Sequence, residues 1–218
     1  MAIALVDVDG TLLCGRTSSE RLFIGHLIAS RTLGLRQSID GLRFFPRWVW
    51  SFGLDTSKKN KAYLSGLDIG AVKRAAETFV ETTLVHRLRP LMLERIERHR
   101  QRGDIVALLS GTPDFLAEPL ARRVGADIWC ATRCAREDGV FLPEPPVVHP
   151  YGDEKLELAQ AMCRENGGAD LGACTAYADT IQDLLLLRHV GHPVAVFPDP
   201  PLKRIALRQG WEVLSDGC

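Results

Sequence analysis

Two aspartates follow a short apolar run near the start of the sequence, IALVDVDGT. Asp7 and Asp9 come directly after Ile3–Val6, and Gly10 and Thr11 follow them. Because side chains alternate along an extended chain, two residues separated by one other point to the same side. A buried strand would avoid ending in two carboxylates, unless both of them meet a metal ion.

Polar residues also follow two later apolar runs. The run DIVALL leads into Ser110, Gly111 and Thr112, and the run CTAYA leads into Asp179. Asp183 comes four residues after Asp179, which predicts that it lies on the same face of the helix expected there. Ligands of open parallel sheets collect outside the carboxyl ends of the strands. These polar residues are therefore expected to face one crevice.

Four carboxylates in one crevice would repel each other and raise some of their pKa values sharply. They come from distant parts of the chain: Asp7, Asp9, Asp179 and Asp183. A divalent cation removes that conflict, and a site built of hard oxygen ligands suits magnesium. The residue types therefore predict a Mg²⁺ site.

The segment SGTP predicts an anion-binding site beside the carboxylates. It joins a strand to a helix whose first turn is expected to hold Pro113, so that backbone N–H groups and the positive end of the helix dipole face the crevice. Lys155 is expected in the first turn of a later helix, where a cation is mildly unfavourable. Asp153, Glu154 and Glu157 would neutralise it on a surface, but beside a phosphate site Lys155 is a functional candidate.

Apolar strands and helices alternate from about residue 86 onward, after the first strand at 3–6. Such alternation predicts a doubly wound parallel sheet with helices on both faces, an α/β fold. The other expected strands are 104–110, 127–133, 174–178 and 193–197, the helices are 90–102, 113–123, 153–166 and 180–190, and a hairpin at 134–143 turns at Asp138 and Gly139.

Residues 15–86 interrupt this alternation. They contain apolar helical stretches at 21–30, 44–52 and 69–85, and no convincing strand. We predict a core domain made of residues 1–14 and 87–218, with an all-helical cap domain inserted at 15–86. The run LRFFPRWVWSFGL within the cap holds two tryptophans among arginines; we favour packing inside the cap, and a lipid-facing surface is the alternative.

The amino-acid composition limits which kinds of molecule the protein is expected to bind. The 27 basic and 27 acidic residues give zero formal charge, so no broad charged surface for nucleic acid or for an anionic membrane is expected. The N-terminal apolar run stops at Asp7, which predicts neither a signal peptide nor a transmembrane segment, and hence a cytoplasmic protein. The cysteines are expected to be free, mostly buried thiols. They are Cys14, Cys130, Cys134, Cys163, Cys174 and Cys218.

The motifs together resemble a known family. DVDGT, LLSGT, the later Lys155 and YADTIQD match, in order and spacing, the four motifs of the haloacid dehalogenase (HAD) superfamily of phosphohydrolases. The inserted helices resemble the cap of subfamily IB, the branch that contains phosphoserine phosphatases, and the resemblance covers nearly the whole chain. It implies a Rossmann-like core and a Mg²⁺-dependent phosphatase that hydrolyses a small phosphate monoester through an aspartyl-phosphate.

The resemblance also implies roles for the four aspartates. Asp7 would be the nucleophile, and Asp9 would protonate the leaving oxygen and then activate water. Magnesium would bind Asp7, the main-chain carbonyl of Asp9 and Asp179, with Asp183 acting directly or through water.

The remaining motif residues would bind the substrate. The resemblance implies that Ser110, Lys155 and the Gly111 N–H hold the phosphoryl oxygens, with Thr112 beside them. Phosphoserine phosphatases carry a glutamate nine residues after the nucleophile, where it meets the substrate amine, and this chain has Arg16 there. A cation at that position disfavours an ammonium group and suits a neutral or anionic one.

Two further residues bear on this expectation. Glu20 is close to Arg16 in sequence but is out of register with the family glutamate, and Gln182 replaces an asparagine that relatives usually have near the metal.

Among the scattered histidines, His149 is expected near the entrance of the crevice. KKNK at 58–61 is expected to be a solvated turn, or else to reach an anionic substrate.

Three other functions remain open from the sequence. The same intermediate would serve a phosphotransferase, which passes the phosphoryl group to an alcohol. A lipid-phosphate phosphatase would use the aromatic cap for peripheral contact with a membrane. A non-catalytic phospho-acceptor module would keep the phosphate on Asp7, although a general acid at Asp9 speaks against that reading.

Overall fold

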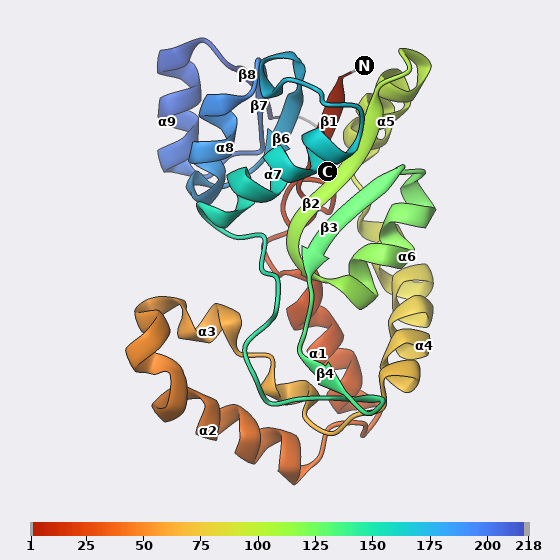
Figure 1. Ribbon diagram of the computed structural model, residues 1–218. Helices are drawn as coiled ribbons and strands as arrows, with labels where there is room; N and C mark the ends of the chain where they lie inside the picture. Colours follow the sequence, from red (N-terminus) through yellow and green to blue (C-terminus); the bar gives the residue numbers. More distant parts are fainter. Residues whose placement is uncertain (1, 216–218) are drawn as a thin grey trace.

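The computed structural model describes residues 2–215, and its centre is a six-stranded sheet in which all neighbouring strands are parallel. The strand order is β3-β2-β1-β6-β7-β8, so the first strand lies inside the sheet (Figure 1). The bounds are β1 (Ile3–Val6), β2 (Ile105–Pro113), β3 (Ile128–Thr132), β6 (Thr175–Ala178), β7 (His192–Val196) and β8 (Glu212–Leu214).

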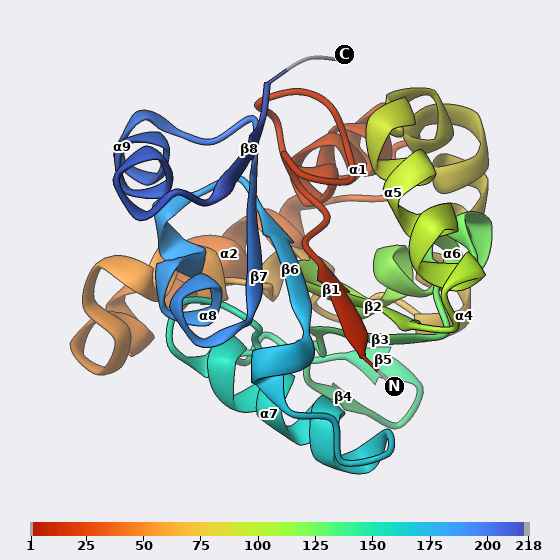
Figure 2. The ribbon, with the colours of Figure 1, turned by 90° about the horizontal axis from the view of Figure 1, so that it is seen from above.

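Helices cover both faces of this sheet, as Figure 2 shows. One face carries α5 (Pro90–Gln101) and α6 (Asp114–Val124), and the other carries α7 (Glu154–Glu165), α8 (Leu184–His189) and α9 (Pro200–Gln209). Strand β1 is buried on both sides because its alternate residues belong to two different apolar clusters, Ala4 and Val6 to one and Ile3 and Leu5 to the other. The predicted doubly wound α/β fold is confirmed.

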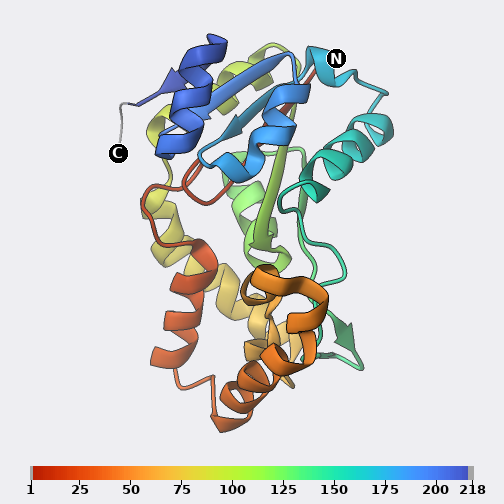
Figure 3. The ribbon, with the colours of Figure 1, turned by 90° about the vertical axis from the view of Figure 1, so that its left-hand side faces the viewer.

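The insertion between β1 and α5 is helical along its length. Figures 1 and 3 show it beyond the carboxyl ends of the strands. Its helices are α1 (Ser19–Ala29), α2 (Leu35–Phe52), α3 (Thr56–Lys59) and α4 (Ile69–Phe79), joined or followed by the short turns η1 (Gly53–Asp55), η2 (Ala62–Leu64), η3 (Val80–Leu84, π-helical) and η4 (Val85–Arg87).

The predicted hairpin exists and lies against this insertion. Strands β4 (Arg136–Glu137) and β5 (Val140–Phe141) pair antiparallel, and the turn residues Asp138 and Gly139 both have positive φ angles, as such tight turns require. The N–H of Gly66 donates to the carbonyl of Phe141 at 2.9 Å, and the N–H of Phe141 donates to the carbonyl of Leu67 at 3.0 Å. A segment of the predicted core range therefore supports the helical insertion.

Several elements differ from the sequence expectations. Strand β8 and helix α9 follow the last element that was predicted, and α2 begins nine residues before the predicted stretch at 44–52. The expected helix at 180–190 begins instead with a 3-10 turn, η6 (Ile181–Asp183), and only then continues as α8. A further 3-10 turn, η5 (Leu171–Ala173), precedes β6.

The cysteine prediction is confirmed for four residues and wrong for one. Cys130, Cys134, Cys163 and Cys174 are free, whereas Cys14 is disulfide-bonded. Cys218 lies outside the described residues. In the part of the chain that the structure describes, no helix has both the length and the apolarity needed to cross a bilayer.

Candidate active site

The carboxyl end of β1 supplies two of the predicted site residues. The N–H of Asp7 donates to the carbonyl of Tyr177 at 3.1 Å, so the pairing with β6 continues one residue beyond the strand. The chain then turns, with the N–H of Leu12 bonded to the carbonyl of Asp7 and the N–H of Leu13 to that of Val8. This turn holds Asp7 and Asp9 at the edge of the sheet that faces the helical insertion.

A buried lysine lies between two of the carboxylates. The Nζ of Lys155 donates to Oδ1 of Asp7 at 2.7 Å and to Oδ2 of Asp183 at 2.9 Å. Burial by itself lowers the pKa of Lys155, but Asp183 and Asp7 outweigh burial and the pKa is raised. Burial raises the pKa of Asp7 and of Asp183, and Lys155 opposes both shifts. Lys155 is therefore a charged partner of the site, as the residue pattern predicted.

Asp179 approaches the same edge because residue 10 is a glycine. Gly10 has φ +85°, and a Cβ added there would lie 2.0 Å from Oδ2 of Asp179. Burial, followed by repulsion from Asp7 and Asp183, raises the pKa of Asp179 to about 8. Three of the predicted carboxylates thus interact electrostatically. Asp183 lies on the η6 turn and not on a helical face shared with Asp179, which corrects the predicted placement.

Asp9 has a different set of partners. Its Oδ1 accepts from the N–H of Ser19 at 2.7 Å, and its Oδ2 accepts from the hydroxyls of Ser19 at 3.1 Å and Thr112 at 3.2 Å. Burial raises its pKa, and these hydrogen bonds oppose the rise. Ser19 is the first residue of α1, so the insertion itself contributes to the surroundings of Asp9. No sequence pattern predicts this role for Ser19, because a serine at a helix start is usually a cap.

The predicted phosphate cradle lies on the end of β2. Ser110 and Thr112 are buried, their hydroxyl oxygens are 3.2 Å apart, and Ser110 hydrogen-bonds Asp7. The strand continues to Pro113, with a register shift against β3 between Leu109 and Pro113. Pro113 is therefore the residue before α6 and not part of its first turn, which corrects the expected boundary. Gly111 lies within this irregular strand end.

Arg89 is a site residue that sequence analysis missed. Its Nε donates to the carbonyl of Thr11 at 3.0 Å and its Nη2 to that of Gly10 at 3.0 Å, and its guanidinium lies 3.7 Å from the centre of the Phe197 ring. It thereby fixes the turn that follows Asp9. No motif marks it, because an arginine before a proline at a helix start is common.

Arg16 lies beside the aspartates of the candidate site. It is exposed and lines a pocket of about 740 Å³ together with Asp9 and Asp179. Glu20 does not reach this pocket, since Lys61 donates to both of its carboxylate oxygens at 2.7 and 2.6 Å. Lys61 is only 3% exposed, so the prediction that KKNK is a solvated turn is wrong for this residue.

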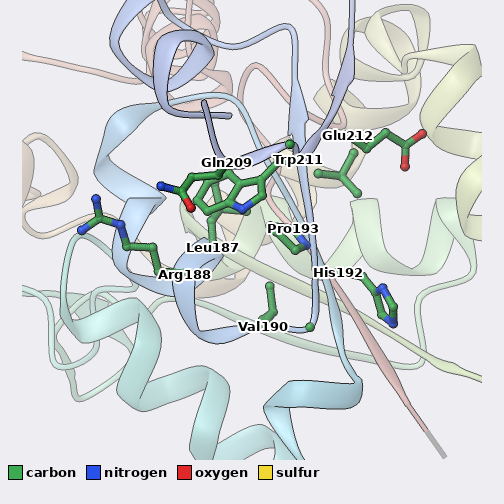
Figure 4. Close-up of a pocket in the computed structure, with 11 residues that line it drawn as sticks. Leu187, Arg188, Val190, His192, Pro193, Gln209, Trp211 and Glu212 are labelled. Atoms are coloured by element: carbon green, nitrogen blue, oxygen red, sulfur yellow. The ribbon is translucent and has the colours of Figure 1, made fainter. Parts of the chain in front are cut away.

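Another pocket, of about 700 Å³, lies at the opposite end of the sheet (Figure 4). Its labelled side chains include His192 and Glu212, which are the first residues of β7 and β8. Ligands of parallel sheets bind at the carboxyl ends of the strands. This pocket is therefore not part of the candidate active site.

The donor set suits a hard divalent cation. Among residues 2–215, no group of three or more His, Cys, Asp or Glu side chains is arranged to hold a metal ion as it stands. Burial, followed by repulsion from Asp7 and Asp183, raises the pKa of Asp179, and a cation would relieve that repulsion. Asp7, Asp179 and the main chain at Asp9 supply oxygen donors of the kind that magnesium prefers.

The fold is a parallel α/β core with inserted helices. Aspartates and the SGTP segment lie at the ends of its strands, and a buried lysine contacts two of the aspartates. This combination defines a hydrolase of the phosphatase type. The haloacid dehalogenase-like hydrolase family matches residues 4–188. The chain belongs to this family, and the resemblance seen in its motifs is confirmed.

Three relatives illustrate the range of proteins to which the chain is similar. It is 32% identical to the inhibition of morphological differentiation protein of Streptomyces azureus, over 97% of this chain and 77% of the relative. It is 26% identical to the phosphoserine phosphatase SerB1 of Mycobacterium tuberculosis, over 97% and 70%. It is 25% identical to a histidinol-phosphatase of Neisseria meningitidis, over 98% of both chains.

Solved structures share the fold. A protein of unknown function from Bordetella pertussis aligns with a TM-score of 0.82 at 24% identity, over 98% of this chain and 97% of that one. A phosphoserine phosphatase solved as a phospho-aspartyl intermediate analogue aligns with a TM-score of 0.60 at 18% identity, over 99% and 94%. The chain is thus a HAD-type phosphatase by family and fold.

Proposed function

We propose that the chain is a Mg²⁺-dependent phosphomonoesterase in which Asp7 forms a covalent aspartyl-phosphate. The observation that carries this proposal is the contrast between two aspartates. Asp7 is bonded to the Lys155 ammonium, which favours its ionised form, whereas the donors to Asp9 from the described residues are neutral groups of Ser19 and Thr112. Carboxyl groups in different surroundings suit different roles, one as nucleophile and one as acid.

The reaction then has two steps. In the first, a carboxylate oxygen of Asp7 attacks phosphorus, the bond from phosphorus to the ester oxygen breaks, and Asp9 gives its proton to the leaving alcohol. In the second, Asp9 takes a proton from water, the water oxygen attacks phosphorus, and Asp7 is released with inorganic phosphate. Ser110, the Gly111 N–H, Thr112 and Lys155 would hold the phosphoryl oxygens in both steps.

Magnesium would be held by Asp7, Asp179 and the Asp9 carbonyl, with Asp183 in support. When bound, it would supply positive charge that offsets the charge of the phosphoryl group and of these carboxylates. Arg16 would contact a part of the substrate beyond the phosphate.

We also propose two domains. Residues 1–14 and 87–218 form the core domain, which carries the chemistry, and residues 15–86 form the cap domain over it. We propose the cytoplasm as the location, which cell fractionation would test.

The test is phosphate release from a panel of phosphomonoesters, with and without added magnesium. We expect metal-dependent release that falls by at least about a thousandfold in Asp7→Asn, because the nucleophile is lost. Asp138→Asn, on the hairpin turn, is the matched control and should retain activity. Release that persists in Asp7→Asn would contradict the proposal. Stimulation of turnover by added alcohols would favour the phosphotransferase, and phosphorylation without release would favour the phospho-acceptor module.

Helix α2 favours peripheral lipid contact as an additional property. Its inner side carries a row of aromatic rings: Phe44 and Trp48 are tilted against each other with centroids 6.1 Å apart, and Trp48 and Phe52 are stacked at 5.7 Å. Apolar residues with helical spacing are exposed elsewhere on it, including Leu35 at 83%, Leu42 at 73% and Trp50 at 94%.

Basic residues accompany this exposed apolar set on the same helix. They are Arg36, Arg43 and Arg47, against one acidic residue, Asp40. An exposed apolar surface flanked by arginines complements an anionic lipid headgroup layer. We therefore propose that α2 binds anionic membranes peripherally.

A further inference from the structure

A chain of two hydrogen bonds connects His149 to the phosphate cradle. The hydroxyl of Thr132 donates to the carbonyl of Gly111 at 2.6 Å, and the same oxygen lies 2.8 Å from Nδ1 of His149. All of these groups are buried or nearly so, His149 being 5% exposed. The ring also lies beside Gly111 directly, since a Cβ at that glycine would be 3.9 Å from Cε1 of His149.

These contacts determine which ring nitrogen carries the proton. The hydroxyl of Thr132 has one hydrogen, and the carbonyl of Gly111 accepts it because a carbonyl cannot donate. Nδ1 of His149 must therefore be the donor to Thr132. Burial, followed by the charges of Lys61, Lys59 and Lys58, lowers the pKa of His149 to about 3, so the ring is neutral near pH 7. In a neutral ring with a proton on Nδ1, Nε2 is an acceptor.

That acceptor has no partner. Nε2 of His149 is buried and no described residue hydrogen-bonds to it. A buried polar atom without a hydrogen-bond partner destabilises the fold, so such atoms usually meet a ligand or an ordered water. Because Nε2 carries only a lone pair, the missing partner must be an O–H or N–H donor.

The pocket beside His149 carries both charges. It has a volume of about 440 Å³ and lies between α3 and the segment that leads into α7, and its lining includes Lys58 and Lys59 as well as the carboxylates of Asp55, Asp153 and Glu154. Lys59 pairs with Glu154 at 3.1 Å, and the Nζ of Lys58 lies 3.7 Å from the centre of the Tyr151 ring. The pocket itself therefore requires a hydrogen-bond donor but does not select the charge of the group that carries it.

We propose that Nε2 of His149 accepts a hydrogen bond from a hydroxyl of the leaving alcohol, and that the preferred substrates are hydroxylated phosphomonoesters with a neutral or anionic leaving group. This inference rests on the proposed phosphatase function and narrows its substrate class. The restriction on charge comes from Arg16, which lines the pocket that contains Asp9 and Asp179 and disfavours an ammonium group on the leaving alcohol. Glu20, whose oxygens are bonded to Lys61 and Tyr63, is not free to attract one.

The test compares three esters: glycerol 3-phosphate, propyl phosphate, which lacks its hydroxyls, and phosphoethanolamine, which carries an ammonium. For the wild type we expect kcat/KM to be about tenfold higher for glycerol 3-phosphate than for propyl phosphate, as one neutral hydrogen bond allows. In His149→Phe this ratio should fall to about one. The ratio is independent of how much of the variant is folded, because both esters meet the same active fraction. In Lys58→Glu, the rate on phosphoethanolamine relative to glycerol 3-phosphate should rise.

Binding of the same esters to Asp7→Asn, by calorimetry, separates this inference from the proposed function. The inference is supported if Asp7→Asn binds glycerol 3-phosphate about tenfold more tightly than propyl phosphate, and if the double variant Asp7→Asn, His149→Phe loses this preference. This result would stand even if the wild type released no phosphate. Absence of phosphate release would contradict only the proposed function. Equal affinity for glycerol 3-phosphate and propyl phosphate, or no binding of either, would overturn the inference. So would NMR detection of the proton on Nε2 instead of Nδ1 in the wild type.

Discussion

Asp7 and Asp9 are two residues apart, yet their chemical surroundings are opposite. A lysine ammonium contacts Asp7, while a helix N–H and two hydroxyls contact Asp9. The difference arises because Asp9 contacts Ser19 at the start of α1, whereas Asp7 contacts Lys155 of α7. A short motif thus acquires two functions through the elements that surround it.

Gly10 is the residue whose substitution should show this most directly. In Gly10→Ala, the left-handed backbone costs about 1–2 kcal/mol, and the added Cβ displaces Asp179. Gly139→Ala is the matched control, since its φ of +81° is similar but no atom lies within 4 Å of the added Cβ. We expect both variants to lose similar stability in urea denaturation, and Gly10→Ala alone to lose most of its phosphatase activity. Equal activity of the two variants would contradict this role for Gly10.

His149 should make stability depend on pH. The folded-state pKa of about 3 lies below the ordinary value of 6.5, so between these values the unfolded chain binds a proton that the folded chain does not. The free energy of unfolding should therefore fall as the pH is lowered through this interval, by at most about 1.4 kcal/mol per pH unit from this residue. Urea denaturation of wild type and His149→Phe from pH 7 to pH 4 should show a smaller fall in the variant. The exposed His86→Phe should behave as the wild type, and parallel curves for all three would contradict the shift.

The sequence predicted some residues of the candidate site and missed others, and the difference has a physical reason. Asp7, Asp9, Ser110 and Asp179 lie in motifs at the ends of apolar strands, where topology alone brings residues together, and Lys155 lies in the first turn of a helix. Other residues of the site act through contacts that link distant segments, and local patterns carry no information about these; they are Ser19, Arg89 and Thr132. The acceptor role of His149 also depends on such a contact.

At the scale of elements, the strands were the most predictable part. Continuous apolar runs between turn signals predicted β1, β2, β3, β6 and β7 to within three residues at each end. The start of α2 was harder to find, because no residue of 35–43 is buried. Leu35 and Leu42 are exposed there, so burial did not shape the pattern.

The exposed surface of α2 gives a prediction at this scale. The protein should co-sediment with vesicles that contain phosphatidylglycerol and bind phosphatidylcholine vesicles weakly. Leu42→Glu combined with Trp50→Glu should reduce binding at least about tenfold, because two exposed apolar contacts become anionic. Leu207→Glu, on the exposed surface of α9, is the control and should bind as the wild type does. A dimer that the double substitution dissociates, without vesicle binding, would show that α2 contacts a second copy instead.

At the scale of the whole molecule, core and insertion share one apolar cluster. Phe23 of α1 packs against Phe79 of α4 and Phe115 of α6, with ring centroids 5.4 and 5.5 Å apart, and Phe115 packs against Phe141 of the hairpin at 5.9 Å. The cluster continues to Val6 on the central strand. The insertion is therefore not expected to unfold on its own.

Calorimetry tests this prediction. We expect one thermal transition with equal calorimetric and van't Hoff enthalpies. Phe23→Ala should lower the free energy of unfolding by about 3–5 kcal/mol and move the whole transition, because Phe23 is fully buried. Phe45→Ala, at a ring that is 42% exposed, should change it by less than about 0.5 kcal/mol. Two transitions, of which Phe23→Ala moves only one, would contradict a shared core.

The most direct measurement of the central claim is mass spectrometry of the enzyme after acid quench during turnover of an active ester. The account predicts a phosphoryl group on the peptide that contains Asp7 and its absence in Asp7→Asn. In Asp9→Asn both steps should slow, because Asp9 is the acid in the first step and the base in the second. Phosphate release at the wild-type rate with no phosphoryl group on Asp7 would contradict it.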